Sequence, residues 1–147
     1  MRSRDVFLRY SEALDRADLA TMTTLVHDRF GLEGAGLDGI GKSEFLAAMK
    51  AQLDAFSGYS ENPTNIREQD DDVHFIAHVT GKHTGTFALP GTGPILPTGR
   101  AIALPPEPAW VRIRDDKLIL YWVAKVPGGG IDGIVAQITG LKPDAAP

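Results

Sequence analysis

The sequence predicts an α+β fold in which helices pack on one face of a curved antiparallel sheet. Over the first half of the chain, apolar residues recur at three- and four-residue intervals, which is the period of amphipathic helices. Between residues 66 and 87, and again between 110 and 126, they alternate with other residues at the period of strands. Helices followed by a meander of strands are typical of this class, and 147 residues suit a single domain, 1–147.

Three helices are expected before the sheet. The first has an apolar face formed by Val6, Phe7, Tyr10, Leu14 and Ala17. Asp18 is a suitable N-cap for a second, shorter helix that continues to Val26. After a short strand between residues 30 and 37, a third helix begins at residues 41–43. It is expected to end near Gly58, because glycine commonly terminates helices.

The second half is expected to form hairpins around charged turns at residues 70–72 and 114–117. The segment from Leu89 to Pro108 is rich in proline and glycine and long for a connection, which predicts a mobile lid over the mouth of a cavity. A last helix is expected from about residue 133 to 138. The tail, residues 141–147, is expected to fray.

Composition argues against several classes of function. The net charge is −4 and no basic cluster exceeds the short one at residues 2–4, so no nucleic-acid partner is expected. No apolar run reaches the roughly 20 residues of a membrane span, and none follows the N-terminal arginines as in a secretory signal. Cysteine is absent, and the four histidines lack the spacing of a metal site. We therefore expect a cytoplasmic protein without a metal or cofactor.

Several motifs carry a resemblance to a known family. They are RYSEALDRADLATMTTL, GIGKSEFLAAM, HTGTF, PTGR and VRIRDDKLILYW. In these motifs the chain resembles the SnoaL-like polyketide cyclases, which belong to the superfamily of nuclear transport factor two and ketosteroid isomerase. The resemblance implies a cone-shaped α+β barrel with about three N-terminal helices, an apolar cavity and a homodimer. It also implies a cofactor-independent enzyme that acts on a bulky carbonyl compound.

The chain departs from this family at two positions. The catalytic aspartate of the polyketide cyclases, four residues after the tryptophan of the last strand, corresponds to Val126. A histidine that they often carry on the preceding strand corresponds to Ala109. Asp132, after the glycines at 128–130, is a candidate replacement for the carboxylate, although an aspartate after glycines more often caps a helix.

Three residues are candidates for proton transfer or carbonyl polarisation. Tyr10 matches the tyrosine that ketosteroid isomerases aim at a carbonyl oxygen; the alternative is a core tyrosine bonded to backbone. His83 shares the inward phase of its strand, where it is either a proton carrier or a packing residue. Glu33 lies one residue before Gly34, which corresponds to the isomerases' base, so it requires the surrounding glycines to turn it inward.

A second group of residues is expected to line the cavity. Trp122 shares the phase of Val126 and is expected to face inward, whereas Trp110 lines the cavity or packs at a dimer interface. The complete set of expected binding residues is Leu14, Phe75, Val79, Trp110, Trp122, Val126 and Asp132.

The sequence thus predicts a cyclase or isomerase that closes a ring in a hydrophobic polyketide-type intermediate. Two mechanisms fit: acid–base catalysis by Tyr10 with His83 or Glu33, or templating of a reactive conformer, which the changes at Ala109 and Val126 favour. The alternatives are a non-catalytic binding or interaction protein and, less favoured, an epoxide hydrolase. An interior closed by bulky side chains favours the interaction protein, and converging polar groups in an open pocket favour the enzyme.

Overall fold

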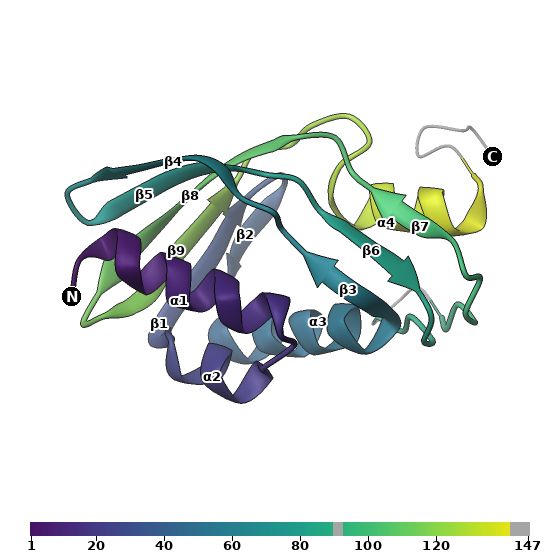
Figure 1. The fold of residues 1–147 in the computed structure, drawn as a ribbon, viewed down its shortest axis with the longest axis horizontal. Coiled ribbons are helices and arrows are strands. Elements are labelled where there is room, and N and C mark those ends of the chain that lie inside the picture. The colour runs from purple at the N-terminus through teal and green to yellow at the C-terminus, as the bar shows by residue number, and fades with distance from the viewer. Residues whose placement is uncertain (90–92, 142–147) are drawn as a thin grey trace.

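The computed structural model describes residues 1–89 and 93–141, in which helices cover one side of a curved, mixed sheet (Figure 1). The helices are α1 Ser3–Asp15, α2 Leu19–Thr24, α3 Lys42–Ala55 and α4 Gly130–Thr139. The strands are β1 Val26–Gly34, β2 Leu37–Ile40, β3 Phe56–Ser60, β4 Thr64–Gln69, β5 Asp72–Ala77, β6 Thr80–His83, β7 Ala101–Ala103, β8 Glu107–Arg114 and β9 Lys117–Val123. The predicted α+β class is confirmed.

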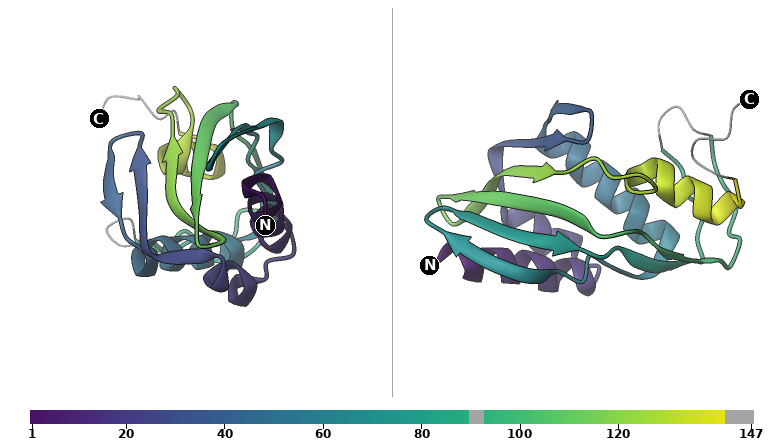
Figure 2. Two further views of the ribbon diagram at one scale, coloured as in Figure 1. Left: turned by 90° about the vertical axis from the view of Figure 1, so that its left-hand side faces the viewer. Right: turned by 90° about the horizontal axis from the view of Figure 1, so that it is seen from above.

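The strands form two sheets, ordered β2-β1-β9-β8-β5-β4 and β3-β6-β7. One long bent hairpin joins them, because β5 continues into β6 while β7 continues into β8. Ala77 pairs with Glu107 in the first sheet, and Thr80 pairs with Ala103 in the second. β2 and β4 are edge strands, so within the described residues the curved sheet stays open and does not close into a barrel (Figure 2). An open sheet leaves one end of the interior to be covered by loops.

The core lies between the sheets and helices α1 and α3. Most of the expected apolar stripe of α1 is buried, since Val6, Tyr10 and Leu14 have no accessible surface. Ala17, the last residue of that stripe, is instead exposed in the turn after the helix, which ends at Asp15. Aromatic rings from helix and sheet meet there, for example Phe7 and Phe75, whose centroids are 4.5 Å apart. In the described part of the chain, no helix has the length and apolar character needed to cross a membrane.

Most element boundaries agree with the periodicity. Asp18 caps α2 as expected, accepting a hydrogen bond from the Thr21 N–H at 3.1 Å. However, α3 ends at Ala55, three residues before Gly58, and Phe56 begins β3 instead of continuing the helical stripe. Val26 similarly belongs to β1, not to the second helix. Pairing with neighbouring strands outweighs the local helical pattern at both places.

The HTG motif ties the loops to the end of α3. The N–H groups of Thr84 and Gly85 both donate to the Ala55 carbonyl oxygen, at 3.0 Å each, and so satisfy the C-terminal end of the helix. A Cβ atom on Gly85 would lie 2.3 Å from the carbonyl oxygen of Asp54, so only glycine fits there. The carbonyl oxygen of His83, at the end of β6, accepts a hydrogen bond from the Gly99 N–H at 2.9 Å, which joins this strand to the segment before β7.

The segment from Leu89 to Pro108 contains more regular structure than expected. β7 and the first residues of β8 lie within it. Phe87, just before it, pairs with Ile95 and is buried. Residues 90–92, near the start of the expected lid, lie outside the described residues, as does the expected frayed tail from residue 142 onward.

Candidate active site

A cluster of polar side chains lies inside the cone, supplied by four different elements. Tyr10 comes from α1, Tyr59 from β3 and Tyr121 from β9, while Glu61 directly follows β3. The Tyr121 hydroxyl donates to Glu61 Oε2 at 2.5 Å, and the Tyr59 hydroxyl donates to Gln52 of α3, also at 2.5 Å. The sequence analysis identified only Tyr10 among these residues.

A β-bulge places Tyr121 on the inner face of β9. The register with β8 shifts by one residue, since Arg112 pairs with Leu120 but Ile113 pairs with Leu118. The Tyr121 ring therefore lies inside, in edge-to-face contact with Phe75 at 6.0 Å. Only 5% of Tyr121 is exposed, so its hydroxyl reaches Glu61 within an apolar setting.

The environment of Glu61 raises its pKa from 4.5 to about 7. Burial of the carboxyl group is the main cause, and the nearby carboxylates of Glu107 and Asp15 add to it, whereas the hydrogen bond from Tyr121 opposes it. As a residue Glu61 is only half-buried, because the connection that carries it runs along the surface while its carboxyl group turns inward. A carboxyl group that exchanges its proton near neutral pH is suited to general acid–base catalysis.

Tyr10 supplies a free hydrogen-bond donor next to this carboxyl group. Its side chain is fully buried, and its hydroxyl has no hydrogen-bond partner among the described residues. Burial and the charge of Glu61 raise the pKa of Tyr10 well above 10, so the phenol keeps its proton. A buried, unpartnered donor is costly, and a ligand oxygen that accepts from it would remove that cost.

His83 is buried with no exposed surface, so its predicted inward orientation is confirmed. Its Nδ1 atom lies 3.2 Å from the Thr98 backbone nitrogen and 3.0 Å from Thr98 Oγ1. Its Nε2 atom has no hydrogen-bond partner in the described part of the chain. The ring packs beside Phe56, with a centroid distance of 5.2 Å.

A second buried carboxylate, missed in the sequence, lies on the inner face of β8. Glu107 is 7% exposed and shares its strand phase with Ala109, the position corresponding to the family's histidine. Burial raises the pKa of Glu107, while a hydrogen bond from the Gly130 N–H, at the start of α4, lowers it. The inward orientation of Glu107 could have been predicted from the alternation of buried and exposed residues in β8, if the predicted strand had been extended to residue 107.

Three predicted site residues lie away from this cluster. Glu33 is exposed, so its expected inward turn is wrong; Gly34 instead packs on β9, where a Cβ atom would lie 2.1 Å from the Val123 carbonyl oxygen. Asp132 is exposed in the first turn of α4 and does not replace the missing carboxylate. Val126 lies in the turn after β9, outside the cluster. In contrast, Leu14, Phe75 and Val79 are buried in the interior.

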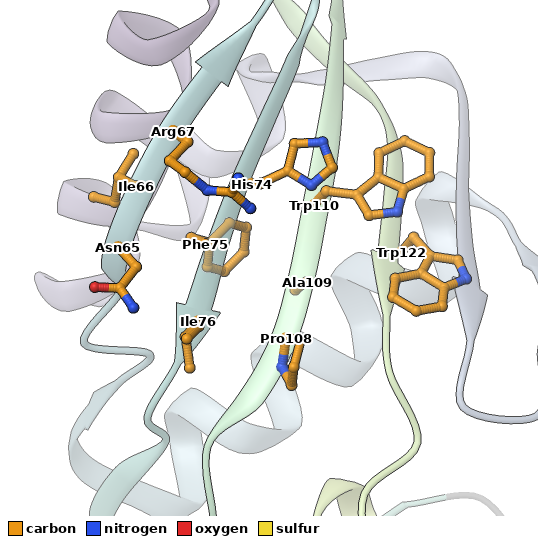
Figure 3. A pocket seen from close by; sticks show the side chains of 10 residues that line it. All are labelled: Asn65, Ile66, Arg67, His74, Phe75, Ile76, Pro108, Ala109, Trp110 and Trp122. Carbon is orange, nitrogen blue, oxygen red and sulfur yellow. The ribbon is translucent and has the colours of Figure 1, made fainter.

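The expected position of Trp122 is also wrong. Trp122 and Trp110 stack on the outer face of the sheet, with ring centroids 6.4 Å apart, and they point away from the helices (Figure 3). Because both faces of β9 carry apolar residues, its phase could not be assigned from hydrophobicity alone.

The two tryptophans border an open groove of about 620 Å³ on the outer face. Strands β4, β5, β8 and β9 form its floor. The His74 ring lies 6.1 Å from the Trp110 ring, and Arg67 of β4 extends toward His74 from the other side (Figure 3). The expected open cavity around Tyr10 is not what the described residues show, because bulky side chains such as Phe7 and Phe75 fill that region. Within residues 1–89 and 93–141, no group of three His, Asp or Glu side chains is placed to hold a metal ion.

A comparison with protein families identifies the chain. A family model described as the SnoaL-like domain matches residues 7–121, which is most of the sequence. The chain belongs to the SnoaL-like family. The match ends at Tyr121 and thus includes Tyr10, Glu61 and His83.

Solved structures with a similar fold include a candidate hydroxylase and two candidate polyketide cyclases. AclR from Streptomyces galilaeus, a candidate hydroxylase, is 19% identical, with a TM-score of 0.75 over 99% of this chain and 84% of that one. IdmH from Streptomyces antibioticus, a candidate polyketide cyclase, is 18% identical, with a TM-score of 0.68 over 84% of this chain and 91% of that one. A candidate SnoaL-like polyketide cyclase from Jannaschia is 15% identical, with a TM-score of 0.71 over 99% and 93%. At these identities the likeness establishes the fold, and a search of curated proteins gives no match.

Proposed function

We propose that this SnoaL-like protein is a cofactor-independent cyclase or isomerase that acts on a hydrophobic carbonyl compound of the polyketide type. The observation that carries the proposal is the Glu61–Tyr121 pair beside the unpartnered Tyr10 hydroxyl in an apolar interior. A base with a pKa near 7 next to a protonated phenol is the combination that enolisation of a ketone requires. Family membership and the names of the structural neighbours support the same class of reaction.

In the proposed mechanism, the Glu61 carboxylate removes a proton from the carbon next to the substrate carbonyl. The electron pair of the broken C–H bond moves to the carbonyl oxygen, and the resulting enolate oxygen accepts a hydrogen bond from Tyr10. For ring closure, the enolate carbon forms a bond to a second carbonyl carbon of the same molecule, whose oxygen takes the proton from Glu61. For isomerisation, Glu61 returns the proton to a different carbon. Tyr121 holds the carboxylate in position by its hydrogen bond.

Binding requires the bulky interior side chains to move apart. The closed interior is the condition that favours an interaction protein, whereas the buried polar cluster favours an enzyme, because polar groups without partners are costly unless a ligand uses them. We give the polar cluster more weight because the family match and the names of the structural neighbours favour the same class. Templating of a reactive conformer, the other mechanism suggested by the sequence, needs neither Glu61 nor Tyr10. The two mechanisms can therefore be separated by mutation.

Exchange of α-protons tests the acid–base mechanism without knowledge of the natural substrate. We expect the protein to accelerate deuterium incorporation into the methyl group of 2-acetonaphthone in D₂O, measured by proton NMR. Replacing the base in Glu61→Gln should reduce this rate by about 100-fold or more. Glu68→Gln, a change in a glutamate of β4 that lies outside the cluster, is the matched control and should keep the rate. Equal rates for the wild type and Glu61→Gln would refute the assignment.

The outer groove favours a second role, in assembly. Trp110, Trp122 and Arg112 form a partly exposed surface, in which the Arg112 guanidinium lies 5.2 Å from the Trp110 ring centroid and also pairs with Asp72. We infer that this face is the contact between two copies of the chain in a homodimer, as the family resemblance implies. Light scattering should give twice the chain mass of 15.8 kDa for the wild type, and a monomer mass would refute the inference. Binding of a different partner on this face is the alternative.

A further inference from the structure

We propose that His83 is a second hydrogen-bond donor to the substrate, which holds an oxygen remote from the carbonyl that reacts at Glu61. The proposal rests on the proposed function and narrows its substrate class. The substrate would be a long hydrophobic molecule that carries carbonyl-type oxygens near both ends. Tyr10 and His83 are matched in this respect, since each is fully buried and each carries a polar atom without a partner in the described residues.

The hydrogen bonds of the PTGR motif fix which nitrogen of His83 carries the proton. The Thr98 backbone N–H donates to Nδ1 at 3.2 Å, so Nδ1 is an acceptor. The Thr98 hydroxyl, 3.0 Å from Nδ1, itself accepts the Arg100 N–H at 3.3 Å and so keeps its own proton free to point at Nδ1. In the neutral ring the proton is therefore on Nε2. His83 presents an N–H group to the interior.

The surroundings of this N–H group are aromatic. Phe56 lies 5.2 Å from the His83 ring, and Phe87 contacts Phe56 edge-to-face at 5.4 Å. On its other side Phe56 lies 6.3 Å from Tyr59, whose phenol is within electrostatic range of Glu61. A chain of buried aromatic rings therefore runs from His83 through Phe56 to Tyr59, whose phenol is influenced by Glu61. Such a chain of rings suits the flat, unsaturated body of a molecule whose two ends are polar.

A purely structural role explains the contact of His83 Nδ1 but not the lack of a partner for Nε2. Its Nδ1 atom anchors the segment that returns to β7, and that contact explains why a histidine is needed at the end of β6. A packing role gives no reason to leave Nε2–H unpaired, because a buried donor without a partner is destabilising. A substrate oxygen supplies the missing acceptor.

Two probes that differ in one atom test the proposal. In 2,6-diacetylnaphthalene a second carbonyl oxygen stands at the remote end, and in 2-acetyl-6-isopropenylnaphthalene a CH₂ group replaces it. We expect the wild-type protein to bind the diketone about tenfold more tightly, the effect of one hydrogen bond. In His83→Phe the two probes should bind equally, whereas His83→Gln, which keeps a donor, should retain part of the preference. Equal binding by the wild type, or an unchanged ratio in His83→Phe, would overturn the proposal.

A spectroscopic measurement keeps the test decisive if the variants fold poorly. In ¹⁵N NMR of the wild-type protein, we expect the His83 Nε2–H signal to shift with the diketone and to stay in place with the CH₂ analogue. A protonated Nδ1 in the free protein, or identical shifts with both probes, would refute the inference. If Glu61→Gln abolishes proton exchange while the probes show no His83-dependent difference, this inference fails and the proposed function stands. If the wild type prefers the diketone through His83 but Glu61→Gln exchanges protons normally, then His83 is a donor to the ligand and the proposed role of Glu61 is refuted.

Discussion

Replacing Glu61 by glutamine should make the protein more stable at neutral and alkaline pH. The pKa of this carboxyl group rises from 4.5 to about 7 on folding, so between these values the native state binds more protons than the unfolded state. Stability therefore falls as the pH rises from 4.5 through 7, and at about 1.4 kcal/mol per pH unit the loss amounts to about 3 kcal/mol. Glutamine carries no charge and can still accept the hydrogen bond from Tyr121, so it avoids this loss.

Urea unfolding at a series of pH values measures this effect. The difference in unfolding free energy between Glu61→Gln and the wild type should be small at pH 4.5 and should grow to about 3 kcal/mol at pH 8. Glu68→Gln is a control of opposite sign, because hydrogen bonding from the Arg4 backbone N–H and from Arg2 lowers the pKa of Glu68. That variant should lose stability at neutral pH. A difference for Glu61→Gln that does not vary with pH would refute the assignment of Glu61 as a buried, ionisable base.

Three further outcomes are expected. Tyr10→Phe removes a buried hydroxyl that has no partner among the described residues, so the urea midpoint should stay the same or rise. The same change should reduce proton exchange of 2-acetonaphthone by about 100-fold. A lower midpoint would show that the hydroxyl forms a hydrogen bond in the free protein. Gly85→Ala forces a Cβ atom to 2.3 Å from the Asp54 carbonyl oxygen and should cost about 1–3 kcal/mol in urea unfolding; an unchanged midpoint would contradict the described contact. Trp110→Lys removes an indole ring from the outer groove and places a cation there, next to Arg112, so it should give a monomer in light scattering; a dimer would place the interface elsewhere.

Much of the fold could be predicted from the sequence, because the spacing of apolar residues and the helix-capping residues specify the helices and strands locally. The α1 stripe that includes Tyr10, the Asp18 cap and the inward phase of His83 each depend on a few neighbouring residues. Whether the curved sheet closes could not be predicted in this way, because closure depends on whether the edge strands β2 and β4 meet, which no local pattern encodes.

The candidate site was only partly predictable, for a different reason. Glu61 follows β3 in a connection that contains a proline, where a carboxylate is normally exposed; its burial arises from Tyr121, which is 60 residues away in sequence. Trp122 was predicted to face inward in place of its neighbour Tyr121, because the bulge in β9 and the apolar residues on both faces conceal the strand phase. Long-range contacts therefore create the chemical properties of this cluster.

Tyr121 and Trp122 are consecutive residues of β9, yet one belongs to the buried cluster and the other to the outer groove. Pairing with β1 on one side and β8 on the other fixes the backbone between them, and with it the directions in which the two side chains leave the strand. A displacement of this backbone from the outside would therefore also displace the phenol that is bonded to the carboxylate.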